Sequence, residues 1–198
     1  MSKFDAVLAR KPLVPLLEID DFGPGFRGMS EDVAKRVGRL SNSVRAMAHA
    51  DDMAVAARTF LNFAGTGGSL DSELTILIRH LVSNLNTCVY CSSHQLKKII
   101  SMGVQADKVE NIQDFETHPA FSAEERAALG FAKALTQDSA NIPDDICDKF
   151  EAAFTPQQRV EIALATAAMD VLNKFNDGMR IPIDDSAMEM AQLAADNF

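Results

Sequence analysis

The sequence lacks basic clusters and long apolar runs, and each shortage excludes a class of protein. Its 198 residues carry 19 basic against 28 acidic side chains, for a formal net charge of -9, and no block of lysine or arginine. Nucleic-acid binding needs positive charge against the phosphates, so we expect no nucleic-acid partner. Charged or amide residues interrupt each apolar stretch well short of the ~20 residues that a membrane span requires. We therefore expect no transmembrane segment and no membrane partner.

The beginning of the chain also lacks the apolar core of a secretory signal. The stretch MSKFDAVLARKPLVPLLEID has charges and prolines where a signal needs an uninterrupted apolar region. This pattern predicts a cytoplasmic protein. Only three cysteines are present, and a chain of this size can bury roughly 70% of its unfolded surface without disulfides. The length predicts a single domain over residues 1–198.

Helical periodicity dominates, and no run of alternating β-branched residues is bounded by hairpin turns. The sequence therefore predicts an all-α helical bundle. Prolines and glycines gather in residues 1–29, so we expect an extended N-terminal arm there and a helical core over residues 30–198. The expected helices cover residues 30–40, 42–64, 71–84, 88–102, 122–135 and 155–178.

Local signals mark where some of these helices begin and end. Ser122 with Glu125 and Thr155 with Gln158 fit the capping box, in which the two side chains bond reciprocal backbone donors. Gly103 suits the left-handed residue that ends a helix. The segment 71–84 is apolar almost all round, which predicts a central, buried helix.

The segment Cys88-Val89-Tyr90-Cys91-Ser92-Ser93-His94 carries the main chemical signal. In a helix, positions three apart share one face, so Cys88, Cys91 and His94 form one stripe. The two cysteine α-carbons then lie about 5 Å apart, within the range of a disulfide. Backbone N–H groups at a helix N-terminus favour a thiolate, and a neighbouring imidazole can take the proton. The stripe predicts a redox-active thiol pair.

Other interpretations of these residues stay open. A c-type haem site needs histidine directly after the second cysteine, where Ser92 stands. Zinc would find three ligands in Cys88, Cys91 and His94, but a single helical stripe makes a tetrahedral site awkward. Two small buried thiols beside a hydrogen-bonded histidine are the structural alternative. Cys147 stands alone and is interpreted as a packing residue.

Polar residues on the preceding helix offer candidates for a proton relay. Glu73, His80 and Asn84 follow spacings of seven and four, which places them near one face. Buried polar groups must find partners, and the thiols are one candidate for that partner. A core or interface histidine is an equal interpretation of His80. Tyr90 points off the thiol face and is interpreted as packing.

The pattern resembles a known family. The segment from Glu73 to Ser101 is similar to the peroxidase-related branch of the alkylhydroperoxidase D-like, carboxymuconolactone decarboxylase superfamily. The similarity covers residues 40 to 183 and extends through Ala48-His49, Glu125-Arg126-Ala127-Ala128-Leu129, Leu172-Asn173-Lys174-Phe175-Asn176-Asp177 and Ile181-Pro182.

The resemblance implies an oligomeric alkylhydroperoxidase D-like bundle with peroxidase activity. In the family's peroxidases the second cysteine attacks the hydroperoxide and the first forms the disulfide. By this resemblance Cys91 is the peroxidatic residue, Cys88 the resolving residue and His94 the base. The implied partners are a hydroperoxide substrate, a lipoylated or thioredoxin-like dithiol reductant and further copies of the chain as a dimer, trimer or hexamer. No bound cofactor is needed, because thiol exchange supplies the electrons.

Two positions depart from the family pattern. Members place a histidine four residues after the second cysteine and a glutamate twelve residues before the first, where this chain has Gln95 and Ile76. Glu73 and His80 lie one turn to either side of Ile76, so either is placed to substitute in a proton relay.

Two other functions stay open from the sequence. One is a non-catalytic thiol sensor that uses disulfide formation as a switch. The other is a carboxymuconolactone decarboxylase-like enzyme that acts on a small carboxylate, with His80 or His94 as acid and base.

Overall fold

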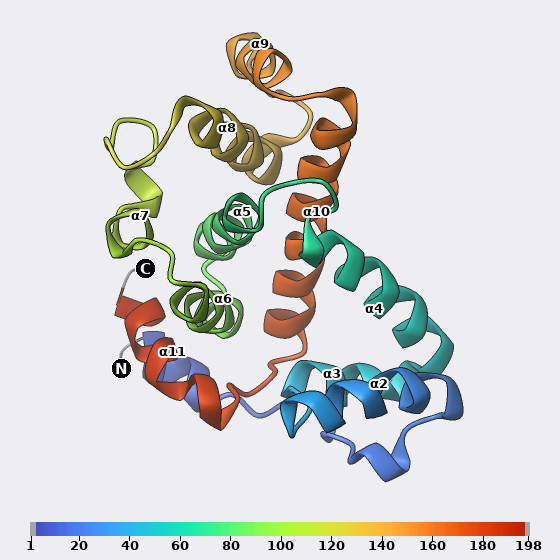
Figure 1. Cartoon of the computed structure of the whole chain (residues 1–198). Helices are drawn as coiled ribbons and strands as arrows, with labels where there is room; N and C mark the ends of the chain where they lie inside the picture. The colour runs from blue at the N-terminus through green and yellow to red at the C-terminus, as the bar shows by residue number, and fades with distance from the viewer. Residues whose placement is uncertain (1–2, 197–198) are drawn as a thin grey trace.

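Helices make up the regular structure of the computed structural model, which describes residues 3–196 (Figure 1). They are α1 (Lys3–Leu8), α2 (Pro24–Val37), α3 (Asn42–Met47), α4 (Asp51–Thr66), α5 (Ser72–Leu85), α6 (Val89–Met102), α7 (Ala106–Glu110), α8 (Ala123–Asp138), α9 (Asp144–Ala153), α10 (Pro156–Gly178) and α11 (Met188–Asp196). Short 3-10 turns stand at 19–21, 48–50, 112–114 and 185–187. The described residues contain no β-strand, so the predicted all-α class is confirmed.

Helix α5 forms the centre of the fold, and α6, α8 and α10 pack around it (Figure 1). Leu77, Ile78 and Val82 have no exposed surface, and Leu74, Ile76 and Leu81 are at most 5% exposed. Each such side chain contributes about 1.5–3 kcal/mol by leaving water. The predicted central helix is therefore confirmed, and it is a rigid base for the residues that follow it.

The predicted start and stop signals are confirmed. Both capping boxes form, with Ser122 and Glu125 at α8 and Thr155 and Gln158 at α10. Gly103 ends α6 in the left-handed conformation, with φ 72°.

The expected helix over residues 42–64 is corrected by the structure. A 3-10 turn at Ala48–Ala50 separates α3 from α4, and α4 continues to Thr66. Gly67 then ends it with φ 77°, a conformation that glycine adopts without steric cost.

The expected extended arm over residues 1–29 also needs correction, because α1 and the start of α2 fall inside it; residues 1–2 lie outside the described part. Pro24 is the first residue of α2, where its missing N–H costs nothing. The Asp51 carboxylate of α4 accepts hydrogen bonds from the Phe26 N–H at 2.7 Å and the Gly25 N–H at 3.4 Å. A residue 25 positions away thus caps α2, which local sequence signals do not reveal.

The turn between α5 and α6 sets the position of the cysteine segment. Thr87 adopts φ 52° in this turn, and the Cys88 N–H donates to the Ser83 carbonyl. Helix α6 then runs back along α5, with α11 packed against its other side (Figure 1). Within residues 3–196, no helix is long and apolar enough to cross a membrane.

Candidate active site

The two predicted thiols meet at the beginning of α6. Cys88 is the N-cap residue, and its Sγ accepts a hydrogen bond from the Cys91 N–H at 3.3 Å. The two side chains are also in hydrogen-bond contact with each other. Both are free thiols, with 0% and 2% of their surface exposed. Residues three apart at the start of a helix lie on one face, within the range that a disulfide can bridge with little backbone movement.

The surroundings of Cys88 favour a neutral thiol. Burial raises its pKa well above the ordinary value, and contact with Cys91 and the charge of Asp177 add to this. Asp177 lies at the end of α10 and hydrogen-bonds with the Cys88 thiol. Burial raises the pKa of Asp177, although the bond with Cys88 and the charge of Arg10 act in the opposite direction. Asp177 is thus a carboxyl group that can take the Cys88 proton.

The surroundings of Cys91 are different, because they include an amide donor and a nearby cation. The Asn176 amide donates to Cys91 Sγ at 3.3 Å. Burial lowers the pKa of the Arg79 guanidinium, and the charge of Cys91 acts in the opposite direction, which places Arg79 within electrostatic reach. The Arg79 Nε donates to Gln95 Oε1 at 3.3 Å. An amide donor and a cation beside one sulfur suit a nucleophilic thiolate.

His94 lies on α6 as predicted but faces other partners. Its Nε2 is 2.7 Å from Asp184 Oδ2, and its Nδ1 is 2.8 Å from the Tyr90 carbonyl oxygen. Its ring stacks on Tyr90 with 4.4 Å between the ring centroids. The hydrogen bonds found for its ring involve no thiol. A role as base for Cys91 stays a prediction, and it requires His94 to leave these partners.

Asp184 is the anchor of that second polar group. It follows α10 and accepts hydrogen bonds from the Tyr90 hydroxyl at 2.8 Å and the Asn42 N–H at 2.8 Å. Burial acts to raise its pKa, but the hydrogen bonds from His94, Asn42 and Tyr90 outweigh it, so the pKa is lowered. The interpretation of Tyr90 as packing alone is corrected, because its hydroxyl links α6 to this carboxylate.

The sequence predicted that Glu73 lies near the thiols, but the structure does not bring them together. Glu73 lies in the first turn of α5 and pairs with Lys108 at 2.7 Å. Lys108 also pairs with Glu125 at 2.6 Å. From Glu73 to Asn84 the helix rises about 16 Å, and Cys88 follows that far end. The spacing put these residues near one face of α5 but did not place them near the thiols along its length.

His80 is a core histidine in this structure. It is 2% exposed, and burial lowers its pKa to about 4. Its hydrogen-bond partner is Asn84, whose amide donates to the His80 carbonyl at 2.8 Å and lies 3.3 Å from the ring nitrogens. The imidazole is therefore neutral near pH 7, and a relay role for it stays a prediction.

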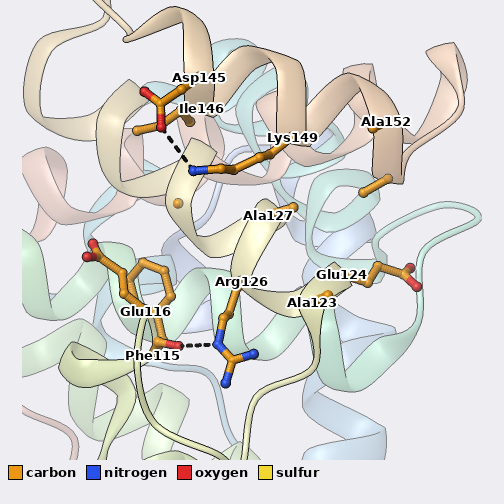
Figure 2. A pocket seen from close by; sticks show the side chains of 12 residues that line it. Phe115, Glu116, Ala123, Glu124, Arg126, Ala127, Asp145, Ile146, Lys149 and Ala152 are labelled. Carbon is orange, nitrogen blue, oxygen red and sulfur yellow. Dashed lines mark hydrogen bonds and ion pairs between the residues drawn. The ribbon is translucent and has the colours of Figure 1, made fainter.

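A pocket of about 800 Å³ lies between α8 and α9 (Figure 2). Arg126, which donates to the Phe115 carbonyl, and the Asp145–Lys149 ion pair are among its lining residues. Neither Cys88 nor Cys91 lines it.

Since both thiols are buried, an oxidant reaches them only after local opening of the structure. Across residues 3–196, no three His, Cys, Asp or Glu side chains are grouped to hold a metal ion.

Solved protein structures match this fold over most of the chain. The crystal structure of the debrominase Bmp8 in complex with 2,3,4-tribromopyrrole matches 93% of this chain and 98% of that chain, with a TM-score of 0.78 and 26% identity. An uncharacterized peroxidase-related protein from Ralstonia eutropha JMP134, an alkylhydroperoxidase AhpD core, matches 93% and 98% with a TM-score of 0.79 and 19% identity. The chain has the AhpD-like fold.

Sequence comparison gives weaker matches to this AhpD-like chain. It is 26% identical to the uncharacterized protein YnjA of Escherichia coli over 113 residues, which are 57% of the chain and 62% of YnjA. The chain thus matches less than two thirds of that relative's length. No family model matches the sequence.

Four polar residues of the candidate site were not singled out from the sequence. Asn176 and Asp177 belong to the segment that carried part of the resemblance, so a signal for them was present. Arg79 and Asp184 had none, because they reach the site from α5 and from the chain after α10. Only the packing of the helices brings them to α6.

Proposed function

We propose that this chain is a thiol-dependent peroxidase that reduces hydroperoxides through Cys88 and Cys91. The proposal is carried by the unequal surroundings of two thiols in contact. Cys91 has an amide donor and a nearby guanidinium, whereas Cys88 is held as a neutral thiol beside Asp177. This division suits one attacking sulfur and one resolving sulfur.

The reaction begins at Cys91. Its thiolate attacks one oxygen of the hydroperoxide, the O–O bond breaks, and the alkoxide leaves with the proton that Cys91 gave up. Cys91 is then a sulfenic acid. The Cys88 thiol gives its proton to Asp177, its sulfur attacks Cys91, and the leaving hydroxide takes up that proton as water. Hydroperoxide and dithiol are converted to alcohol, water and disulfide.

Turnover requires an external dithiol. A lipoylated or thioredoxin-like protein attacks the Cys88–Cys91 disulfide, becomes oxidised itself and restores both thiols. No resident cofactor takes part in this scheme, because the two sulfurs carry both electrons.

Two single substitutions test the assignment. Cys91→Ser removes the attacking sulfur and should abolish peroxide consumption. Cys88→Ser leaves the attack intact and should trap a sulfenic acid on Cys91, detected by mass spectrometry after dimedone labelling. Cys147→Ser is the matched control, because Cys147 lies on α9 and is remote in sequence from both thiols. Unchanged consumption in both site variants would overturn the proposal.

Reductive debromination is a second candidate, favoured by the match to Bmp8 over 93% of this chain. The same thiol pair would supply two electrons, replacing a C–Br bond by C–H and releasing bromide and a proton as the disulfide forms. Incubation of the reduced protein with tribromopyrrole, followed by bromide measurement, separates the two. Bromide release in proportion to disulfide would favour this candidate, and its absence beside peroxide consumption would exclude it.

A further inference from the structure

Three cations from three helices gather around Arg79, which lies within electrostatic reach of Cys91. They are Arg58 on α4, Arg79 on α5 and Lys98 on α6. The Arg79 Nη1 is buried and has no hydrogen-bond partner. Leaving a buried guanidinium nitrogen without an acceptor costs free energy, so binding of an acceptor there would be favourable.

Helical spacing aligns this group with the nucleophile. Cys91, Gln95 and Lys98 follow spacings of four and three, so they form one stripe along α6. Gln95 in this stripe accepts the Arg79 Nε hydrogen bond. The stripe leads from the buried sulfur to Lys98, which is exposed.

Helix α4 also contacts Arg79. Arg58 donates to Asn62 at 3.1 Å, and Gly65 comes one turn later on the same face. A Cβ at Gly65 would lie 3.2 Å from Arg79 Nη1, so this face of α4 packs directly on the guanidinium. The faces of α4 and α6 thus converge at Arg79.

Among the residues that the structure describes, these cations have no acidic partner. No ion pair joins any of them to a carboxylate within residues 3–196, although the chain carries nine more acidic than basic side chains. Burial lowers the pKa of Arg79, and the charge of Arg58 adds to this while Cys91 opposes it. Burial and the charge of Arg79 likewise lower the pKa of Lys98. An anion between them would relieve this repulsion.

We propose that Arg58, Arg79 and Lys98 form a carboxylate-binding subsite beside Cys91, and that the substrate is an organic hydroperoxide that carries a carboxylate. The Arg79 guanidinium has a buried Nη1 without an acceptor, and its planar fork matches the two-oxygen geometry of a carboxylate. Lys98 at the surface would attract the anion first, and Arg79 would hold it near the sulfur. This inference deepens the proposed peroxidase function and rests on it.

Alkylation of Cys91 tests the subsite without any peroxidase turnover. Iodoacetate and iodoacetamide are similar in size but differ in charge, so their rate ratio at Cys91 cancels the cost of opening the structure. Mass spectrometry assigns each adduct to its cysteine. Arg79→Gln and Lys98→Gln should each lower the iodoacetate-to-iodoacetamide ratio about tenfold. Lys97→Gln, an equal charge change on the neighbouring exposed residue, should leave the ratio within about twofold.

Because Arg79 is partly buried, Arg79→Gln needs a circular dichroism check, and the exposed Lys98→Gln keeps the test decisive if Arg79→Gln fails to fold. A ratio that is the same in Lys98→Gln, Lys97→Gln and the unaltered chain would overturn the subsite.

Turnover then tests the substrate class. Cumene hydroperoxide and its 4-carboxylate differ only in the anion, and the carboxylate should show the higher kcat/KM by about tenfold, with the advantage lost in Lys98→Gln. Equal turnover of both compounds would refute this inference while leaving the peroxidase proposal intact. Turnover of neither would refute the peroxidase proposal, and the alkylation ratio would still report on the subsite.

Discussion

His80 makes stability depend on pH in a way that can be calculated from its environment. The side chain is 2% exposed on central helix α5, and burial lowers its pKa from an ordinary 6.5 to about 4. Between these values the unfolded chain binds a proton on this histidine and the folded chain does not. The folded state is therefore fully stable above pH 6.5 and loses stability as the pH falls toward 4.

The size of the effect follows from the two pKa values. Each pKa unit is worth about 1.4 kcal/mol, so the folded state should lose about 3 kcal/mol between pH 6.5 and pH 4 through His80 alone. That is a substantial share of the 5–15 kcal/mol by which domains are typically stable, roughly a fifth or more. Carboxylates with ordinary pKa values near 4 take up protons in the lower part of this window, so the comparison with a His80 variant isolates the histidine.

Urea unfolding at half-unit steps from pH 7.5 to 4.5 measures the slope. Glutamine at position 80 cannot gain a proton. The free energy of unfolding of His80→Gln should therefore fall by about 3 kcal/mol less over the window than that of the unaltered chain. His49→Gln is the matched control, because His49 is exposed, and it should keep the slope of the unaltered chain. Equal slopes for His80→Gln and the unaltered chain would refute the reasoning that burial keeps this imidazole neutral.

Two further predictions concern the stability of the fold around the site. Gly67→Ala should destabilise the fold by about 2–3 kcal/mol, because φ is 77° and the new Cβ would lie 2.0 Å from Thr75 Oγ1. Gly130→Ala lies within α8 with open space around it, so it should raise stability by about 0.5–1 kcal/mol. Thermal melting should therefore show a lower melting temperature for the first variant and a higher one for the second. Lys108→Met should cost about 1–2 kcal/mol, since Glu125 loses the cation 2.6 Å away, and added salt should shrink that difference; a neutral result would mean that the pair contributes nothing.

Local signals were enough for most of the fold. The apolar surround of α5 predicted its central position, and the capping boxes that start at Ser122 and Thr155 predicted where α8 and α10 begin. These features depend on residues within a few positions of one another, so they can be recognised without the tertiary structure. The contact of Cys88 with Cys91 has the same origin, because i and i+3 share a helix face.

Features that depend on distant residues could not be predicted in this way. The carboxylate of Asp51 caps α2 across 25 positions, and Asp184 reaches His94 across 90. Glu73 lies in the first turn of α5 and pairs with Lys108, away from the end of α5 that leads to Cys88. This could not be predicted, because periodicity fixes the face of a helix but not the neighbours along its length. Lys108, which pairs with Glu73, comes from a separate element.

The redox couple of Cys88 and Cys91 is the central claim, and one measurement tests it most directly. Reduced Cys147→Ser protein receives one equivalent of hydroperoxide, and mass spectrometry follows the peroxide and the peptide that contains Cys88 and Cys91. The account predicts that one peroxide disappears for each disulfide formed between these two residues. Persistence of both free thiols while the peroxide remains would contradict it.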